Sequence, residues 1–218
     1  NGRVSTSNFS YPVALQAAPP YTLDINQGLN LIANQFDRGS NTLNVILTNV
    51  PDNSQLLKWN VAAQDLVEIY TFVAASAAWL PEGGTLSPGE AAFLANPGGA
   101  YPIMFTGSPR VPALPVPLTR NAFHYLSRQT ADIGSWDSIT GLPPEEGALL
   151  LRWEVSLQDF QTNRYTGGQW QPTNPVVNIG EGVVIWLPPP PPPLPTITCP
   201  ADLVTNVFGG SVAVNYPN

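Results

Sequence analysis

The chain has 218 residues, a formal net charge of −7 and only 11% charged residues, compared with about 25% in ordinary soluble domains. Its 25 prolines and 18 glycines disfavour helices, while 43% hydrophobic residues supply enough apolar surface to fold. This composition excludes a mostly helical protein and predicts an all-β one. One lysine and seven scattered arginines leave no basic patch for nucleic acid.

The ends of the chain and its single cysteine indicate where the protein works. No apolar stretch reaches the roughly 18 residues of a membrane span, and the first three residues, Asn1-Gly2-Arg3, do not resemble a signal peptide. We therefore expect a processed piece of a longer protein. Scarce Lys and Glu beside abundant Thr, Asn, Gly and Pro favour a secreted or cell-surface location. Cys199 is the only cysteine, so no disulfide can form within the chain.

A tandem duplication with a spacing of about ninety residues organises the chain. Residues 58–66 (KWNVAAQDL) match 152–160 (RWEVSLQDF), and 89–97 (GEAAFLANP) match 180–188 (GEGVVIWLP). The predicted segments are an extended N-terminal segment (1–19), a first copy (20–107), a proline-rich linker (108–118), a second copy (119–187), a polyproline linker (188–195) and a C-terminal strand or hairpin (196–218). Each linker is expected to be stiff and extended.

The same elements are expected in both copies, in the same order. They are a short strand (29–35 and 122–128), one helical turn (41–47 and 136–139), a strand (56–59 and 149–153), a second strand after a turn (66–72 and 160–166), and a strand launched by a Gly-Glu turn (91–94 and 183–186). Residues 101–106 add an edge strand, because Pro102 cannot donate to a ladder. Each copy is thus predicted to be a small β-sandwich or partly open barrel.

These motifs resemble known modules. The strings GLNLIANQ (28–35), LKWN (57–60), TLSPGE (85–90) and FTG (105–107) resemble a β-rich module of large, largely uncharacterised secreted bacterial surface proteins. The second copy, with NIGEG (178–182), is similar to the diverged partner that comes after this module. The resemblance implies an exported, non-enzymatic protein. Residues 195–203 (PTITCPADL) resemble the start of a hyalin repeat, an immunoglobulin-like adhesion domain, although the chain has no partner cysteine.

Candidate catalytic and metal-binding residues are few, and each has a structural interpretation. His124 occupies the position of Asn30 in the first copy, so the module does not require an imidazole there. Glu90 and Glu181 come directly after matching glycines, and we expect them to accept backbone N–H groups in their turns. Asp65 and Asp159 are interpreted in the same way, and residues 37–41 lack the spacing of a calcium loop. The prediction is no enzyme, no cofactor and no metal.

Tryptophans separate into two groups. Trp59, Trp79, Trp153 and Trp170 recur in both copies, so we expect them in structural positions. Trp136 and Trp186 have no aromatic counterpart. They are therefore candidates for an interface or for stacking on a sugar, and plain packing is the main alternative.

The terminal segments suggest how the protein assembles. Residues 196–204 and 211–216 favour strands, and an isolated hairpin is marginal in water. Pairing of this hairpin with the sheet of a neighbouring subunit, by strand addition, would stabilise it. The interface candidates in these segments are Ile197, Cys199, Val212, Val214 and Tyr216 at one end and Phe9, Tyr11 and Val13 at the other. The predicted function is an extracellular structural subunit of a self-assembling filament or surface layer. The alternative is a carbohydrate-binding or adhesion module of a larger secreted protein.

Overall fold

The computed structural model describes residues 19–194 and residue 209, and the all-β prediction is confirmed there. The first copy contains β1 (Tyr21–Ile25), β2 (Gly28–Ala33), α1 (Leu43–Ile46), β3 (Gln55–Asn60), β4 (Asp65–Val73), β5 (Ala78–Leu80), β6 (Ala91–Asn96) and β7 (Tyr101–Phe105). The second contains β8 (Phe123–Leu126), α2 (Trp136–Thr140), β9 (Leu149–Glu154), β10 (Asp159–Thr166), β11 (Gln169–Gln171) and β12 (Val183–Trp186).

The strands form three sheets, and the two larger sheets are equivalent. Their orders are β2-β6-β3-β4-β5 in the first copy and β8-β12-β9-β10-β11 in the second. The register is preserved as well. Leu31 pairs with Phe93 between β2 and β6, and Tyr125 pairs with Val184 between β8 and β12. The third sheet is the pair β1-β7, in which Pro102 lies opposite Asp24. The predicted duplication is therefore visible as a repeated sheet.

One strand of each five-stranded sheet, β6 or β12, is buried on both faces, which explains the continuous apolar runs in these two strands. Successive side chains point to opposite faces of a strand. In β6, Ala92 and Leu94 therefore face the first copy's own core, while Ala91 and Phe93 face a core shared with the second copy. In β12, Val184 contributes to that shared core and Ile185 to the second copy's own core.

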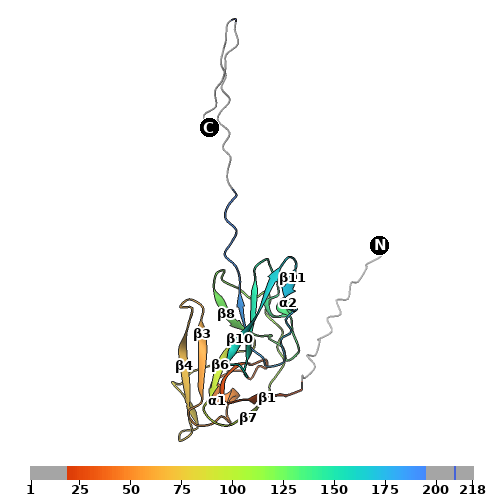
Figure 1. Ribbon diagram of the computed structural model, residues 1–218. Coiled ribbons are helices and arrows are strands. Elements are labelled where there is room, and N and C mark those ends of the chain that lie inside the picture. The colour runs from red at the N-terminus through yellow and green to blue at the C-terminus, as the bar shows by residue number, and fades with distance from the viewer. Residues whose placement is uncertain (1–18, 195–208, 210–218) are drawn as a thin grey trace, which may run out of the picture.

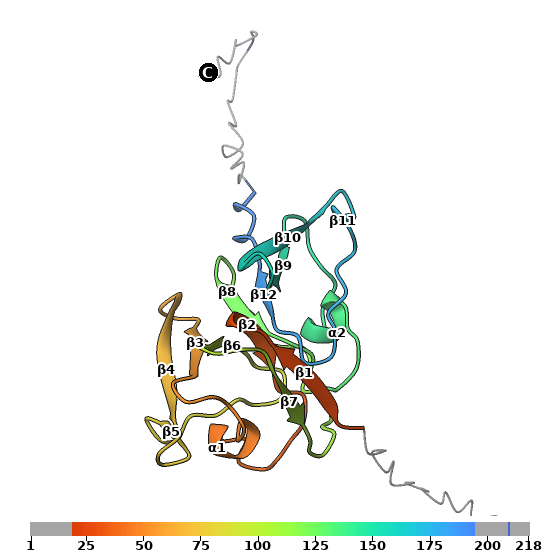
Figure 2. The same cartoon turned by 60° about the horizontal axis from the view of Figure 1, so that its bottom comes forward.

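The two copies lie side by side, with their sheets meeting in the middle of the molecule (Figures 1 and 2). Figure 2 shows β5 and β11, the last strands of the two sheets, at opposite ends. The linker 108–118 binds to both copies. Ser108 pairs with Asp37 of the first copy, and Val116 N–H donates to the Thr140 carbonyl of the second. Residues 188–194 lead away from the body of the molecule (Figures 1 and 2).

The structure also contains elements that the sequence pattern does not predict. No strand is expected at β1, and β5 and β11 are too short for alternation to register. The two helical turns, in contrast, lie where they are expected.

Candidate functional site

The edge of β2 that faces the second copy, which we call the inner edge, is closed by side chains of that copy. Leu29 N–H donates to Oε1 of Gln158 at 2.7 Å. The Leu29 carbonyl accepts the indole N–H of Trp153 at 2.8 Å and Nε2 of Gln158 at 3.0 Å. A side-chain amide offers one acceptor and two donors, so it can bind a backbone unit as a neighbouring strand would. Trp153 and Gln158 therefore take the place of a strand at this edge.

The first copy returns the same contacts to β8. Phe123 N–H donates to Oε1 of Gln64 at 2.7 Å, and the Phe123 carbonyl accepts Trp59 Nε1 at 2.8 Å and Gln64 Nε2 at 3.3 Å. The contacts are reciprocal because the Trp and Gln positions belong to the duplicated motif. We call these six residues the clasp: Leu29, Trp153 and Gln158, with Phe123, Trp59 and Gln64. Its approximate two-fold symmetry is that of a homodimer built into one chain.

The glutamines of the clasp have an unusual backbone conformation. Gln64 and Gln158 have φ of 52° and 51°, a left-handed conformation that costs an L residue about 1–2 kcal/mol. Glycine would be the ordinary residue at such a turn. Each Gln Nε2 also donates within its own turn, to Val61 O at 2.7 Å or Val155 O at 2.8 Å. The hydrogen bonds to the other copy offset the cost of this conformation.

Backbone contacts extend the joint between the copies. Ala33 N–H donates to the Gly180 carbonyl, and Ser127 N–H donates to the Gly89 carbonyl, both at 2.9 Å. Gly89 and Gly180 have φ of 90° and 74°. A Cβ would lie 2.5 Å from Gln129 Cγ at Gly89 and 2.6 Å from a Leu23 methyl at Gly180. Each glycine thus suits its left-handed conformation and leaves room for a close neighbour, Gln129 beyond the end of β8 at Gly89 and β1 at Gly180.

The two glutamates after these glycines act as predicted, as turn carboxylates. Glu90 Oε2 accepts Ser87 N–H at 2.9 Å, and Glu90 Oε1 lies 2.6 Å from Lys58 Nζ. Glu181 has the corresponding partners: Asn178 N–H at 2.8 Å and Arg152 Nε at 2.7 Å. Each carboxylate binds a turn to the neighbouring strand of its own sheet. Its oxygens are already engaged by an N–H group and a cation, which suits a structural role.

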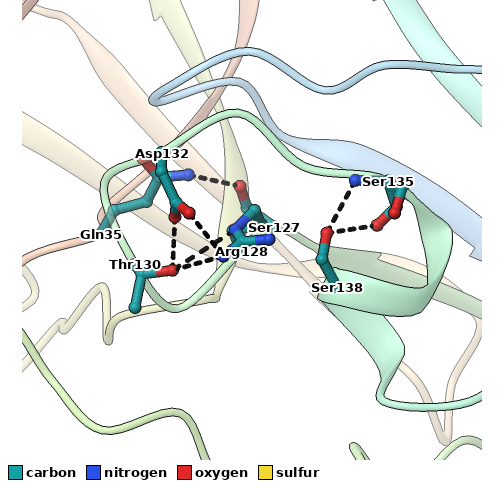
Figure 3. Close-up of polar contacts among 7 residues, drawn as sticks. All are labelled: Gln35, Ser127, Arg128, Thr130, Asp132, Ser135 and Ser138. Atoms are coloured by element: carbon teal, nitrogen blue, oxygen red, sulfur yellow. Dashed lines mark hydrogen bonds and ion pairs between the residues drawn. The ribbon is translucent and has the colours of Figure 1, made fainter.

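A buried polar chain crosses the joint at Gln35, which has no solvent exposure. Gln35 Oε1 accepts Gly180 N–H at 3.0 Å, and Gln35 Nε2 donates to Ser127 Oγ at 3.2 Å. Ser127 Oγ in turn donates to the Glu181 carbonyl at 2.7 Å. Figure 3 shows the Gln35–Ser127 contact. Buried polar groups are costly unless paired, so this chain fixes how the copies meet.

The loop after Ser127 is held by its own polar contacts (Figure 3). Arg128 donates to Asp132 Oδ2 at 2.7 Å, and Thr130 Oγ1 donates to Asp132 Oδ1 at 2.6 Å. Ser135 N–H donates to Ser138 Oγ at 2.7 Å where α2 begins. These bonds connect near neighbours in sequence, and they shape the loop that leads from the joint into α2.

His124 and the turn at residues 37–41 also have structural geometry. His124 is 5% exposed, and its Nε2 lies 3.0 Å from both the N and the O of Thr119. Asn30, its counterpart, accepts Asn26 N–H at 2.9 Å. Each side chain binds the segment just before its strand. Hydrogen bonds from Gly39 N–H and the Asn41 amide lower the pKa of the Asp37 carboxyl, so its Oδ1 is occupied within the turn.

The two candidate tryptophans have different positions. Trp136 is 2% exposed in the second copy's core, which agrees with plain packing and not with a surface platform or an interface residue. The ring fills the space between α2 and the sheet. Trp186 is half-buried at the end of β12, opposite Phe123 and Leu149. The other interface candidates lie outside the described residues: Phe9, Tyr11, Val13, Ile197, Cys199, Val212, Val214 and Tyr216.

The far edges of the two large sheets are only partly covered. Among residues 19–194, β5 pairs with β4 only at residues 71–73, and β11 pairs with β10 only at residues 164–166. The first half of each long strand therefore has no strand on its outer side. The pairing of β3 with β4 shifts register at one point: Lys58 pairs with Glu68, but the next residue, Trp59, pairs with Leu66. Val67 of β4 is therefore an extra residue, a bulge, and it is half-exposed. The pairing of β10 with β9 is regular throughout.

Residues 19–194 contain no group of three or more His, Cys, Asp or Glu side chains that could hold a metal ion. Within the same part of the chain, no helix is long and apolar enough to cross a membrane. Comparison with protein-family models, with curated proteins and with solved structures finds no match. Function must therefore be inferred from the geometry of the chain itself.

The residues that sequence reasoning missed are the clasp glutamines. The sequence marks Gln64 and Gln158 only as members of the repeat motif. A signal is available, because a long amide recurring in a β-turn between two strands has no obvious local use. Nothing in the motif shows that its partner is the other copy.

Proposed function

We propose that this protein is an extracellular structural subunit that assembles with copies of itself into a filament or surface layer. Strand addition to the outer edge of β10 would join the subunits. The observation that supports this is the contrast between sheet edges. The inner edges, β2 and β8, are closed by the clasp, whereas residues 159–163 of β10 have no strand on their outer side among residues 19–194. Natural proteins usually protect such edges.

The edge of β10 is a better acceptor than that of β4. Tyr165 exchanges hydrogen bonds with residues 147 and 148 on the β9 side. Successive residues of a strand direct their backbone N–H and C=O groups to opposite sides. The groups of Phe160 and Thr162 therefore point away from β9, toward the outer edge. Phe160 N–H is occupied by the Asp159 carboxylate at 2.7 Å, so Thr162 offers the outward donor. The bulge at Val67 twists β4, and bulges are a known protection of edges.

The proposed donor is the C-terminal segment, residues 196–218, with its alternating apolar residues. Residues 188–193 are six consecutive prolines, a sequence that favours a stiff extended chain. Residues 188–194 lead away from both copies (Figure 1), which would make the donor segment available to another molecule. A donor at one end and an acceptor on the body make a head-to-tail contact that does not close, which generates a filament.

The test is negative-stain electron microscopy of the full chain and of a variant lacking residues 196–218. We expect filaments or sheets from the full chain and none from the truncated one. A full chain that stays monomeric at every concentration, or unchanged filaments from the truncated chain, would overturn the proposal.

A pair of substitutions tests the acceptor edge. Thr162→Pro removes the outward backbone N–H without removing a hydrogen bond to β9. Thr162→Val keeps this backbone N–H and replaces the side chain by one of similar shape. Assembly should be lost in the first and retained in the second, at matched thermal unfolding temperatures. Filaments of normal length from a folded Thr162→Pro variant would show that β10 is not the acceptor.

A further inference from the structure

The β10–β11 hairpin lies at the far end of the second copy (Figure 2) and lines a hollow. Its volume is about 530 Å³, within the range of small-molecule sites. The lining residues are uncharged: Tyr165, Gly168, Gln169, Trp170, Gln171, Pro172, Thr173 and Asn174. Tyr165 and Trp170 are half-buried and the other six are exposed. The lining therefore combines a half-buried aromatic pair with exposed amide and hydroxyl residues.

The first copy provides an internal comparison, because its β4–β5 hairpin has the same pairing. Phe72 lies opposite Trp79 with ring centroids 5.6 Å apart, as Tyr165 lies opposite Trp170 at 5.4 Å. Trp79 is only 1% exposed, and its indole N–H donates to the Leu47 carbonyl at 2.9 Å. Trp170 is half-buried instead.

The residues around this aromatic pair differ between the copies in one direction. Ala78 and Leu80, which flank Trp79, correspond to Gln169 and Gln171, which flank Trp170. Phe72 and Val73 correspond to Tyr165 and Thr166 in the same pairing. These four apolar residues of the first hairpin are thus amide or hydroxyl residues in the second, while the tryptophan is kept. Solubility alone would be served by charged residues, whereas uncharged hydrogen-bonding groups suit a bound ligand.

The core of the second copy contains Trp136, and Trp170 packs against that core without being one of its buried members. In the first copy, Asn44 of α1 accepts the backbone N–H of Trp79 at 2.8 Å, and the Trp79 ring fills the core. In the second copy, Trp136 of α2 fills the core, and its ring centroid lies 5.4 Å from that of Trp170. Trp170 therefore rests on Trp136 and Tyr165. It is held in place by packing, as a binding platform should be.

We propose that the Trp170 hollow binds an uncharged oligosaccharide. The C–H groups of a sugar ring pack on the face of an aromatic side chain, which carries partial negative charge. Side-chain amides donate to and accept from sugar hydroxyls. No lining residue is charged, so an anionic glycan would have no cation to pair with. The hollow and the proposed acceptor edge use different residues, 165 and 168–174 against 159–163, so the two proposals can be tested separately.

The test uses an array of uncharged oligosaccharides of glucose, galactose, mannose and N-acetylglucosamine, followed by titration calorimetry of any sugar bound. The first variant is Trp170→Ala. The second, Gln169→Ala with Gln171→Leu, installs the residues of the first copy and keeps the aromatic pair. We expect binding to weaken about tenfold or more in each, with the thermal unfolding temperature of the double variant close to that of the parent chain.

Trp186→Ala is the matched control, because this half-buried tryptophan lies outside the hollow. Retained binding in this variant, with loss in the other two, supports the proposal. It is overturned if the array shows no binding to any uncharged sugar, if the double variant binds normally, or if only Trp186→Ala loses binding.

Discussion

The two copies share their joint and differ at their far ends. The positions at the joint recur almost one for one: the clasp, the Gly-Glu turns and the paired glutamates with their cations. At the far ends, a buried Trp79 in an apolar hairpin corresponds to a half-buried Trp170 in a polar one. Packing constrains the joint from both sides, whereas each far end faces solvent and is free to diverge. New binding chemistry is therefore expected at the far ends.

The largest effect is expected at the shared core. Phe93 is 4% exposed, and its ring lies 4.8 Å from Trp153 and 5.8 Å from Tyr125 of the second copy. Phe93→Ala should lower the free energy of unfolding by about 4 kcal/mol. Because both copies use this core, urea unfolding should remain a single transition shifted to lower urea. Two separate transitions, with only the first copy destabilised, would show that the copies fold independently.

The far ends should respond unequally to the same substitution. Trp79→Ala leaves a cavity in the first copy's core and should cost about 4 kcal/mol. Trp170→Ala removes a ring that is already partly hydrated and should cost about 1–2 kcal/mol. Chemical denaturation of the two variants measures the difference. Equal losses would mean that Trp170 is as much a core residue as Trp79, and would remove the structural argument for a binding platform.

Sequence patterns predict the elements of the fold better than their partners. The duplication, the two helical turns and the Gly-Glu strands are predictable because turn residues and apolar runs are local signals. The clasp is not, because a Trp at a strand end shows that it packs without showing on which copy. Local patterns also leave the position of Trp136 open. A tryptophan without an aromatic counterpart is compatible with an interface, a sugar platform or packing, and the structure places this ring in the second copy's core.

A smaller change in stability is expected in the clasp, where two contributions can be separated: the hydrogen bonds that Gln158 makes and the cost of its left-handed backbone. Gln158→Ala removes the hydrogen bonds to Leu29 and keeps the left-handed backbone, so it should destabilise the chain by about 2 kcal/mol. Gln158→Gly loses the same bonds but relieves the backbone, and should be about 1 kcal/mol more stable than the alanine variant. Thermal and urea unfolding of the pair provide the measurement. An alanine variant as stable as the parent would show that the clasp contributes nothing.

The smallest effect concerns a turn in which the copies differ by one ionisable group. Asn60 Oδ1 accepts the N–H groups of Ala62 and Ala63 at 2.9 Å. Its counterpart Glu154 accepts Ser156 Oγ–H at 2.8 Å and Ser156 N–H at 3.2 Å. These hydrogen bonds lower the pKa of the Glu154 carboxyl below its ordinary 4.5. The folded state thus favours the ionised form. The stability that this turn contributes is present above pH 4.5 and is lost as the pH falls through the lowered value.

The Ser156 amide resonance in NMR spectra should therefore shift with a midpoint below pH 4.5, whereas the Ala62 and Ala63 amides should not share that titration. Glu154→Gln converts the second turn to the neutral chemistry of the first and should abolish the shift at Ser156. An unchanged Ser156 titration in this variant would assign the pH dependence to another group, and the turns of the two copies would then be equivalent. Acid sensitivity confined to the second turn would instead show that divergence between the copies reaches individual hydrogen bonds even where the backbone has been kept.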